Sequence, residues 1–402
     1  EYVPTEYTVS AGAENSFDLT KIIPIKTEGS ILGASTVNLT LPFDETKYTI
    51  TTKFAEKYDD RNLTAKLSEF GLSGHDGIDF ALPQGISIKS VDDGKVILSG
   101  NKLYGITFEP VEGCPLPHPD AQAYEVKEAD GTHTGVLYMD FHPRESKRQG
   151  AWCGGYRDHK VIDGKEITPV VTIVGNFTPP AGDKPALLSM DDVLTLFHEF
   201  GHGLQALFSD NHYSGTTVAW DIVELPSQIM EHWATQPEVL AMYAKHYETG
   251  EVIPQELIEK IRNSSYFNTG FDNVEIMAAS LLDMAYYSLE APVNIDVQKF
   301  EKEAMQKIGL IPEIEPRYRS TYFLHMISGY DAGYYVYTWA AVLDNDAFEA
   351  FSEKGIFDQA TATSFRKNVL EKMGTMDAEQ MYLNFRGREP EIEPLLRNRG
   401  LN

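Results

Sequence analysis

Two histidines lie four positions apart in the segment HEFGH, as His198 and His202, and Glu199 directly follows the first of them. On a helix, residues at i and i+4 lie one turn apart on the same face, so both imidazoles can reach a single cation. Glu199 would then lie close enough to take a proton from a water molecule bound to that cation. This spacing predicts a zinc site with its own general base, which is the chemistry of a metallopeptidase.

The residues around this segment predict the helix that the spacing requires. Ser189 is a favourable N-cap residue, and Asp192 follows it by three positions, as in a capping box. An apolar stripe at helical spacing comes next: Val193, Leu194, Phe197, Phe200, Leu204, Leu207 and Phe208. A capped helix with an apolar face favours a metal site over a chance match to a five-residue pattern.

A catalytic zinc ion takes three protein ligands and keeps one position open, so a third ligand is needed. Glu224, 22 residues after His202, is the best candidate. Because an unpaired buried carboxylate is costly, Glu224 and Glu231 each need a metal or a hydrogen-bond partner. The apolar residues of their segment predict a second buried helix: Ile222, Val223, Leu225, Ile229, Met230 and Trp233.

Longer stretches around these residues resemble the thimet oligopeptidase family of zinc peptidases. The family pattern is HEFGH followed by a glutamate in a D-[FI]-V-E-x-P-S-Q segment, and this chain has FHEFGHGLQALFS and then SGTTVAWDIVELPSQIMEHW. The resemblance covers residues 101–402 and is strongest to the bacterial dipeptidyl carboxypeptidase branch, with oligopeptidase A next. Other similar segments include NKLYGITFEP (101–110), GAWCGGY (150–156), PRYRSTYFLHMISGYDAGYYVYTWA (316–340) and FRGREPEIEPLLRNRGL (385–401).

The resemblance implies that one zinc ion is held by His198, His202 and Glu224, with Glu199 as the general base. It implies that Asp221 accepts a hydrogen bond that orients one ligand histidine, as metal sites commonly require. The activity that it implies is hydrolysis of short peptides, with release of dipeptides from their C-terminal end.

In the segment HMISGYDAGYYVY, the substrate-facing residues of the family fall on His325, Tyr330 and Tyr337. Their hydroxyl and imidazole groups would stabilise the oxyanion of the tetrahedral intermediate. Aromatic packing is the alternative role for residues of this kind, and it is the role that we predict for Tyr334 and Tyr335.

Removal of a C-terminal dipeptide also requires a cation or a set of donors for the substrate carboxylate. Arg317, Arg319 and His325 are candidates because they lie in the same stretch of family-like sequence. The sequence does not choose among them.

The first hundred residues have a different sequence pattern from the rest of the chain. Residues 74–100 resemble the opening of lysostaphin-type cell-wall endopeptidases, in which the positions of His75 and Asp79 would bind metal. Those enzymes complete the site with a later His-x-His pair, and none of the eleven histidines here forms one. Since two ligands do not make a stable catalytic site, a β-hairpin that acts as a cap or linker is favoured over a second working site.

These patterns predict a multidomain α+β protein. Residues 1–100 alternate apolar and polar side chains, as in KYTITTKF (47–54), and predict a small β-rich module. Residues 101–402 predict a mainly α-helical catalytic domain of the zincin type with a small β-sheet. Its strand candidates are GVLYMDF (135–141) and PVVTIVGNF (169–177).

Composition restricts the classes of partner. The 402 residues carry a formal net charge of −26, which argues against binding to nucleic acid. No apolar run approaches the roughly 18 residues that a membrane span needs. Cys114 and Cys153 predict free thiols rather than a disulfide framework. The expected partners are short peptides, and the expected compartment is the cytoplasm or periplasm of a bacterial cell.

Three functions are compatible with the sequence. The leading hypothesis is a zinc metallopeptidase that releases C-terminal dipeptides. The first alternative is an inactive or weakly active fusion or binding protein with a residual zinc site. The second alternative is a cell-wall endopeptidase that works through the N-terminal module.

Overall fold

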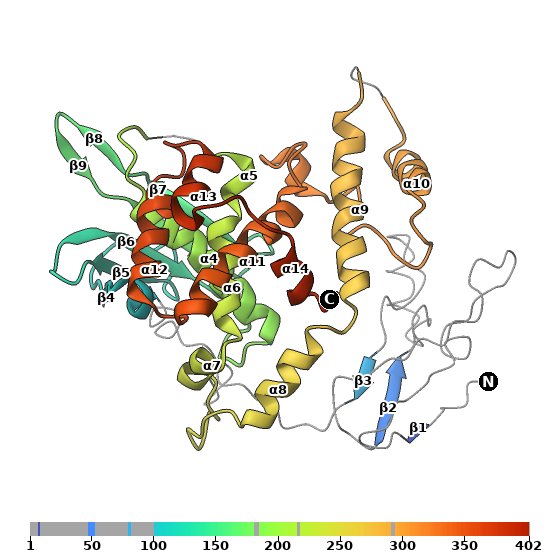
Figure 1. Cartoon of the computed structure of the whole chain (residues 1–402), viewed down its shortest axis with the longest axis horizontal. Helices are drawn as coiled ribbons and strands as arrows, with labels where there is room; N and C mark the ends of the chain where they lie inside the picture. The colour runs from blue at the N-terminus through green and yellow to red at the C-terminus, as the bar shows by residue number, and fades with distance from the viewer. Residues whose placement is uncertain are drawn as a thin grey trace, which may run out of the picture. The chain divides into compact units, whose positions relative to one another are not determined.

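The computed structural model describes residues 100–401 except 181–184, 215–217 and 291–293 (Figure 1). Before residue 100 it describes only the backbone of the strands β1 (Tyr7–Thr8), β2 (Lys47–Thr52) and β3 (Asp79–Ala81). The chain divides into two compact units. The first comprises Glu1–Ile86 and Asn263–Leu324, and the second comprises Ser87–Arg262 and His325–Asn402.

A five-stranded mixed sheet forms one layer of the second unit. Its order is β4 (Thr107–Pro110), β5 (Gln122–Lys127), β6 (His133–Asp140), β10 (Val170–Val174) and β7 (Trp152–Arg157). Strand β10 runs parallel to β6, and the other neighbours are antiparallel. The strands predicted at 135–141 and 169–177 are confirmed as β6 and β10. A short hairpin, β8 (Lys160–Ile162) with β9 (Lys165–Ile167), follows β7.

The predicted metal-site helix is α4 (Met190–Phe208), and both its predicted capping residues and its apolar stripe are confirmed. Ser189 caps it and forms a reciprocal capping box with Asp192. The predicted stripe is buried, apart from the half-buried Leu194, and it belongs to a core shared with the sheet. The capping and the apolar face explain both where this helix starts and which side it buries.

Helix α4 lies between two layers, and two glycines make this possible. On the sheet side, a Cβ at Gly203 would lie 3.0 Å from Ile173 of β10. On the opposite side, a Cβ at Gly201 would lie 2.1 Å from the carbonyl oxygen of Pro226 and 2.7 Å from the Cα of Ser227. Position 201 therefore admits only glycine without a shift of the backbone that crosses it.

The second predicted helix is interrupted at Glu224. It consists of α5 (Trp220–Val223) and α6 (Leu225–Ala234), and Glu224 is the residue between them. Pro226 explains the break because proline has no backbone N–H to donate and favours the first turn of a helix. Glu224 thus projects from a junction held against α4.

The remaining helices of the second unit pack around this centre. Helix α11 (Val336–Lys354) covers α6, and its buried Asp346 accepts hydrogen bonds from Tyr382, Arg386 and Arg388. These bonds attach the C-terminal segment to α11. The other elements are α7 (Pro237–Tyr243), α12 (Gln359–Phe365), η2 (Arg366–Leu370), α13 (Ala378–Arg386) and α14 (Glu393–Asn398). Two more, α8 (Gln255–Ser264) and η1 (Leu324–Ile327), lie mostly in this unit and end or begin in the first.

The first unit contains the helices α9 (Thr269–Tyr287) and α10 (Val297–Lys307). Glu301 of α10 joins Arg319 and the backbone N–H of Ser320. Strands β1, β2 and β3 form an antiparallel sheet in which β2 lies within the predicted strand 47–54. The strand candidates nearer residue 100, and the segment that resembles a cell-wall endopeptidase, lie largely outside the described residues.

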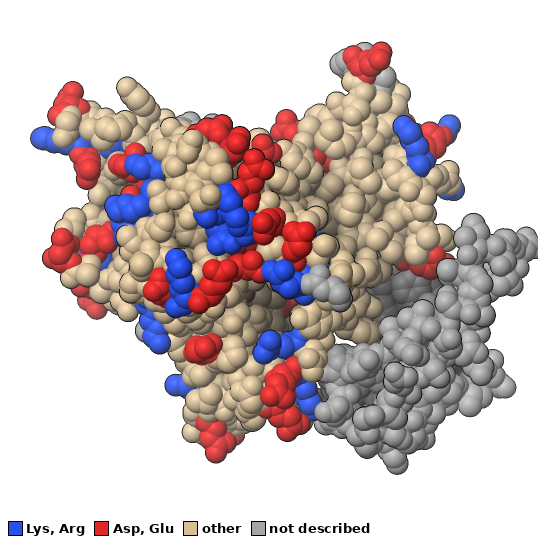
Figure 2. Space-filling model, viewed as in Figure 1, with Lys and Arg blue, Asp and Glu red and all other residues tan. Residues whose placement is uncertain are grey.

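Acidic and basic side chains are interspersed on the face that Figure 2 presents, without a broad basic area. This distribution agrees with the net charge of −26. Among the described helices, none combines the length and the apolar composition that crossing a bilayer requires.

Candidate active site

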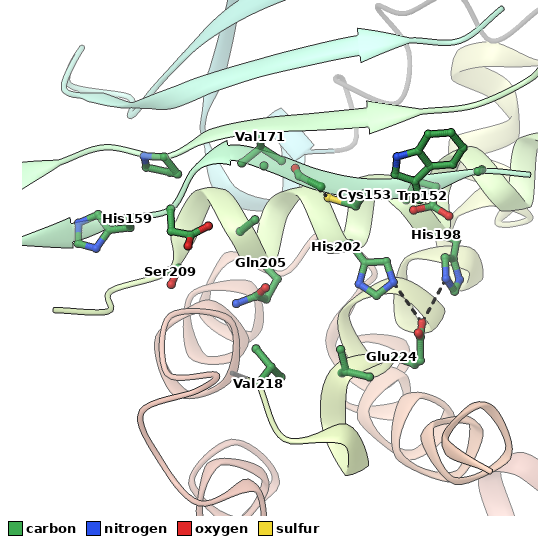
Figure 3. Close-up of a pocket in the computed structure, with 18 of the residues that line it drawn as sticks. Trp152, Cys153, His159, Val171, His198, His202, Gln205, Ser209, Val218 and Glu224 are labelled. Carbon is green, nitrogen blue, oxygen red and sulfur yellow. Dashed lines mark hydrogen bonds and ion pairs between the residues drawn. The ribbon is translucent and has the colours of Figure 1, made fainter. Parts of the chain in front are cut away.

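His198, His202 and Glu224 converge on one point at the junction of α4 and α5. Oε2 of Glu224 lies 3.2 Å from Nε2 of His198 and 3.1 Å from Nε2 of His202 (Figure 3). One ligand atom from each of the three residues lies within 4.8 Å of the others. Helical spacing brings the two histidines together, and the close crossing at Gly201 brings the glutamate to them.

These three residues fit a zinc ion. Two imidazoles and a carboxylate are a common ligand set of catalytic zinc, with bonds of about 2.0–2.2 Å. Ligand atoms at two corners of a tetrahedron with such bonds lie roughly 3.3 Å apart, close to the separations between the glutamate and the two histidines. The two separations that involve Glu224 are therefore compatible with a small tetrahedral cation.

Glu224 is buried, and both of its carboxylate oxygens have partners. Tyr330 donates a hydrogen bond of 2.6 Å to Oε1, and the hydroxyl of Ser227 lies 2.7 Å from Oε2. Burial alone would raise the pKa of Glu224, but the charges and hydrogen bonds of His202 and His198 outweigh burial and hold the pKa well below its usual range. The carboxylate is thus kept ionised, as a metal ligand must be.

His198 is oriented by a second carboxylate. Its Nδ1 lies 2.7 Å from Oε1 of Glu231, while its Nε2 faces Glu224. Donation of the Nδ1 proton to Glu231 leaves the lone pair of Nε2 directed at the metal position. Glu231 and Glu224 both lie at α6, one at the start of the helix and the other two turns on.

Glu199 lies in the same cavity and is largely shielded from solvent. Burial raises the pKa of its carboxyl group, and the neighbouring imidazoles of His198 and His202 and the backbone of Cys153 oppose part of that rise. A carboxylate with a raised pKa is a stronger base toward a water molecule than an exposed one. This environment is compatible with the general-base role that the sequence predicts for Glu199.

The cavity around these residues has a volume of about 610 Å³. Its walls come from α4, the edge strand β7, the segment before α5 and the loop that precedes α11. Figure 3 shows Trp152 at the end near His198 and His159 at the opposite end, beyond Gln205. The cavity is thus an elongated groove that runs along β7 and α4.

His325, Tyr330 and Tyr337 line this cavity. The rings of Tyr330 and Tyr337 stack with an interplanar angle of 5° and a centroid separation of 5.7 Å, and His325 stands edge-on to both. Burial raises the pKa of both phenols far above the usual range, so both stay protonated and can donate hydrogen bonds. Three side chains that can form hydrogen bonds therefore line the groove, and in this structure the hydroxyl of Tyr330 donates to Glu224.

Comparison with known proteins identifies the family of this chain. The model of the protein family described as "Peptidase family M3" matches residues 87–401. The chain belongs to peptidase family M3.

Two proteins of Escherichia coli are similar to this chain. Dipeptidyl carboxypeptidase is 42% identical over 313 residues, which cover 76% of this chain and 46% of that protein. Oligopeptidase A is 36% identical over 312 residues, which cover 75% of this chain and 45% of that protein. The chain therefore matches about half the length of these relatives. Among solved structures, a carboxypeptidase of Pyrococcus furiosus gives a TM-score of 0.45 at 15% identity, over 84% of this chain and 62% of that chain.

For this M3 chain, the structure differs from the sequence-based expectation at Asp221. Asp221 accepts a hydrogen bond from the hydroxyl of Tyr335, and Glu231 takes the position beside His198. Because Glu231 follows Glu224 by two helical turns, it returns to the face of α6 that meets α4. Tyr335 is also more exposed than predicted, whereas Tyr334 is buried as expected for a packing residue.

The remaining residues that the sequence suggested as binding residues lie in the first unit or outside the fully described residues. Arg317 and Arg319 belong to the first unit, where Arg317 pairs with Glu275 and Arg319 pairs with Glu301 and Glu315. His75 lies outside the described residues, and for Asp79 only the backbone is described.

Sequence reasoning missed Ser227 and Trp220 of this M3 chain. Ser227 contacts the carboxylate of Glu224, and Trp220 packs against the ring of Tyr330 at 4.6 Å. The signal for Ser227 was its position three residues after Glu224, one helical turn away. No sequence pattern pointed to Trp220, because its partner lies more than a hundred residues further along the chain.

Proposed function

We propose that this chain is a zinc metallopeptidase that hydrolyses short peptides and releases dipeptides from their C-terminal end. The observation that carries the proposal is the presence of His198, His202 and Glu224 in one cavity with Glu199. Family membership and the similarity to a protein named dipeptidyl carboxypeptidase support it. The finer fold assignment, a zincin-type catalytic domain over residues 101–402 after a β-rich module over residues 1–100, is part of the same proposal. The compartment, cytoplasm or periplasm, stays a prediction.

His198, His202 and Glu224 would hold the zinc ion, and Glu231 would orient His198. When bound, zinc supplies Lewis-acid polarisation of the substrate carbonyl and lowers the pKa of water at the site. The protein contributes a fixed donor set, an anionic ligand kept ionised by its neighbours, and an open side toward the groove.

Glu199 would move the protons of the reaction. Its carboxylate takes a proton from the attacking water and later gives that proton to the departing amine, so that one residue acts first as base and then as acid. Burial raises the pKa of Glu199, and a raised pKa favours uptake of the proton in the first step while still permitting its release in the second.

Tyr330, Tyr337 and His325 would stabilise the oxyanion that forms when the scissile carbonyl is attacked. Their hydroxyl and imidazole groups line the groove, and their geometry is fixed by aromatic packing before substrate enters. Loss of a single oxyanion donor typically costs about 2.7–4 kcal/mol in the barrier.

A turnover assay tests the proposal. The chain is loaded with zinc, its metal content is measured, and a blocked tetrapeptide is followed by mass spectrometry with and without chelator. We expect one equivalent of zinc and dipeptide release that the chelator abolishes. Zinc without turnover would instead support a binding protein with a residual zinc site, and clearing of peptidoglycan would support a cell-wall endopeptidase.

Substitution of the general base gives the sharpest variant. Glu199→Gln removes the proton acceptor but leaves the three metal ligands in place, so zinc content should persist while peptide cleavage falls by at least about 100-fold. Glu256→Gln, at an exposed carboxylate on α8, is the matched control and should keep full activity. Cleavage at the parent rate by Glu199→Gln would contradict the mechanism.

A further inference from the structure

The groove has a preformed place for an extended peptide backbone. Strand β7 is the outer strand of its sheet, and no strand in the described part of the chain pairs with its outer edge. Trp152, Cys153, Gly154 and Gly155 of this strand line the groove. An exposed strand edge can hydrogen-bond an added peptide strand, and the two glycines leave room for it to approach.

Glu199 and the metal position lie near one end of β7 rather than at its centre. Cys153, the second residue of β7, lines the cavity with Glu199, and Figure 3 shows Trp152, the first residue of β7, beside His198. Four residues of β7 follow Cys153, which correspond to about 13 Å of extended chain. Only Trp152 precedes it in the strand. A peptide bound along β7 therefore has a long arm on one side of Glu199 and a short arm on the other.

Arg148 stands at the end of the short arm. It lines the groove, and its guanidinium lies over the ring of Trp152 at 5.3 Å from the centroid. The loop that carries it is fixed by Asn176, whose amide donates to the carbonyl oxygens of Arg148 (2.8 Å) and Gly150 (2.7 Å). Within the described ranges of the chain, no carboxylate forms an ion pair with Arg148.

The charge of Arg148 determines which end of a peptide can lie there. A guanidinium attracts a terminal carboxylate and can bind it through two parallel hydrogen bonds, whereas it repels a terminal ammonium. A peptide with its carboxylate at Arg148 runs antiparallel to β7, which is the commoner way for strands to pair. Two extended residues span only about 7 Å, which suits the short arm.

We infer that Arg148 binds the C-terminal carboxylate of the substrate and thereby sets the length of the released piece, an inference that rests on the peptidase function proposed above. Arg148 is a specificity-determining residue in this assignment. The cation at the opposite end, Arg157, is already engaged, because its Nε donates to the carbonyl oxygen of Thr168 at 2.7 Å.

Peptide binding to the zinc-loaded Glu199→Gln variant tests this role without any need for turnover. The probes are N-acetylated tetra-alanine and its C-terminal amide, titrated by calorimetry. We expect the free acid to bind about 10- to 100-fold more tightly than the amide, as for charge-assisted hydrogen bonds to a single carboxylate. Adding Arg148→Ala should remove this difference by weakening the binding of the free-acid peptide alone. With Arg148→Lys in its place, part of the difference should remain.

Arg157→Ala is the matched control, because it removes the same side chain at the other end of the same strand. It should change the binding of either peptide by less than about 3-fold, since its distance from the short arm leaves the carboxylate contact intact. The inference is overturned if acid and amide bind equally to the Glu199→Gln variant or if neither binds. It is also overturned if Arg157→Ala, rather than Arg148→Ala, removes the tighter binding of the acid.

The outcome for Arg148 can be told apart from the outcome for the peptidase function. If the free acid binds more tightly than the amide and this depends on Arg148, but the parent chain releases no dipeptide, then Arg148 binds the carboxylate and the proposed activity is wrong. If dipeptides are released but acid and amide bind alike, the activity stands and Arg148 has no such role. Because Arg148 is exposed, its substitution should leave the thermal midpoint of unfolding unchanged.

Discussion

Glu231 holds the ring of His198 by the nitrogen opposite the one that faces the metal position. A carboxylate in this place fixes the tautomer and orientation of the imidazole and raises its basicity. Sequence reasoning recognised that Glu231 needed a partner but assigned the orienting role to Asp221. The choice between the two acids depends on side-chain direction across the contact of α4 and α6, which residue spacing alone does not give.

Glu231→Gln is expected to weaken zinc binding by about 10- to 100-fold, because the orienting charge is lost while all three ligands remain. The affinity can be measured by competition with a chromophoric chelator. Asp221→Asn is the control. It removes a carboxylate that bonds Tyr335, and it should change zinc affinity by no more than about 3-fold. The opposite pattern would return the orienting role to Asp221.

Among the elements, α4 and α6 together make the site. Spacing and capping residues were sufficient to predict α4, because its hydrogen bonds join residues only four positions apart. They were not sufficient for the second helix, which was predicted as continuous and is broken at Glu224. Pro226 was visible in the sequence, but the backbone of α6 crosses at Gly201, and that crossing is a tertiary contact.

Gly201→Ala should separate α4 from α6, because the new Cβ would lie 2.1 Å from the carbonyl oxygen of Pro226. We expect a loss of about 2–4 kcal/mol in the free energy of unfolding, as for other overpacked sites, together with weaker zinc binding. Chemical denaturation of the zinc-free and zinc-loaded chain measures both effects.

Gly270→Ala is the matched control for this substitution. Gly270 lies in the first turn of α9, and its added Cβ would meet nothing within 4 Å. The exchange should leave zinc affinity unchanged and stabilise the chain slightly, by up to about 1 kcal/mol, because alanine loses less entropy than glycine in a helix. Equal effects of the two substitutions would mean that the crossing at Gly201 does not position the site.

For the molecule as a whole, charged contacts between distant segments maintain the second unit. The carboxylate of Asp346 on α11 is fully buried and binds Arg386 and Arg388 from the C-terminal segment. Burial alone would raise the pKa of Asp346, but the hydrogen bonds from Arg386, Tyr382 and Arg388 outweigh it and lower the pKa below the usual 3.8. The C-terminal segment is therefore held to α11 by an ionised group.

A pH dependence of stability follows from this lowered pKa. The contribution of Asp346 is complete above the pKa of the unfolded carboxyl and is lost as pH falls through the lower folded value, because the unfolded chain binds the proton first. We expect the thermal midpoint to fall as pH decreases from about 5 to about 3, with a shallower fall in Asp346→Asn.

At neutral pH, Asp346→Asn should itself cost about 3–5 kcal/mol, since it leaves Arg386 buried without its counter-charge. Glu303→Gln, at an exposed ion pair with Lys299 on α10, is the control and should cost less than about 1 kcal/mol. An Asp346→Asn variant as stable as the control would show that this network does not hold the C-terminal segment.

The sequence by itself determined the donor types of the site, the helix that carries two of them, and the family that the chain belongs to. The helix follows from residues close together in the chain, where helical periodicity and capping act, and the family follows from similar segments spread over residues 101–402. Only the tertiary structure decided that Glu231 rather than Asp221 faces His198, that Arg317 and Arg319 pair with nearby acids, and that Arg148 lines the groove beside Trp152. The first outcome depends on how α4 packs against α6, the second on α9 and α10, and the third on the loop before β7. Packing brings together residues that no local spacing relates.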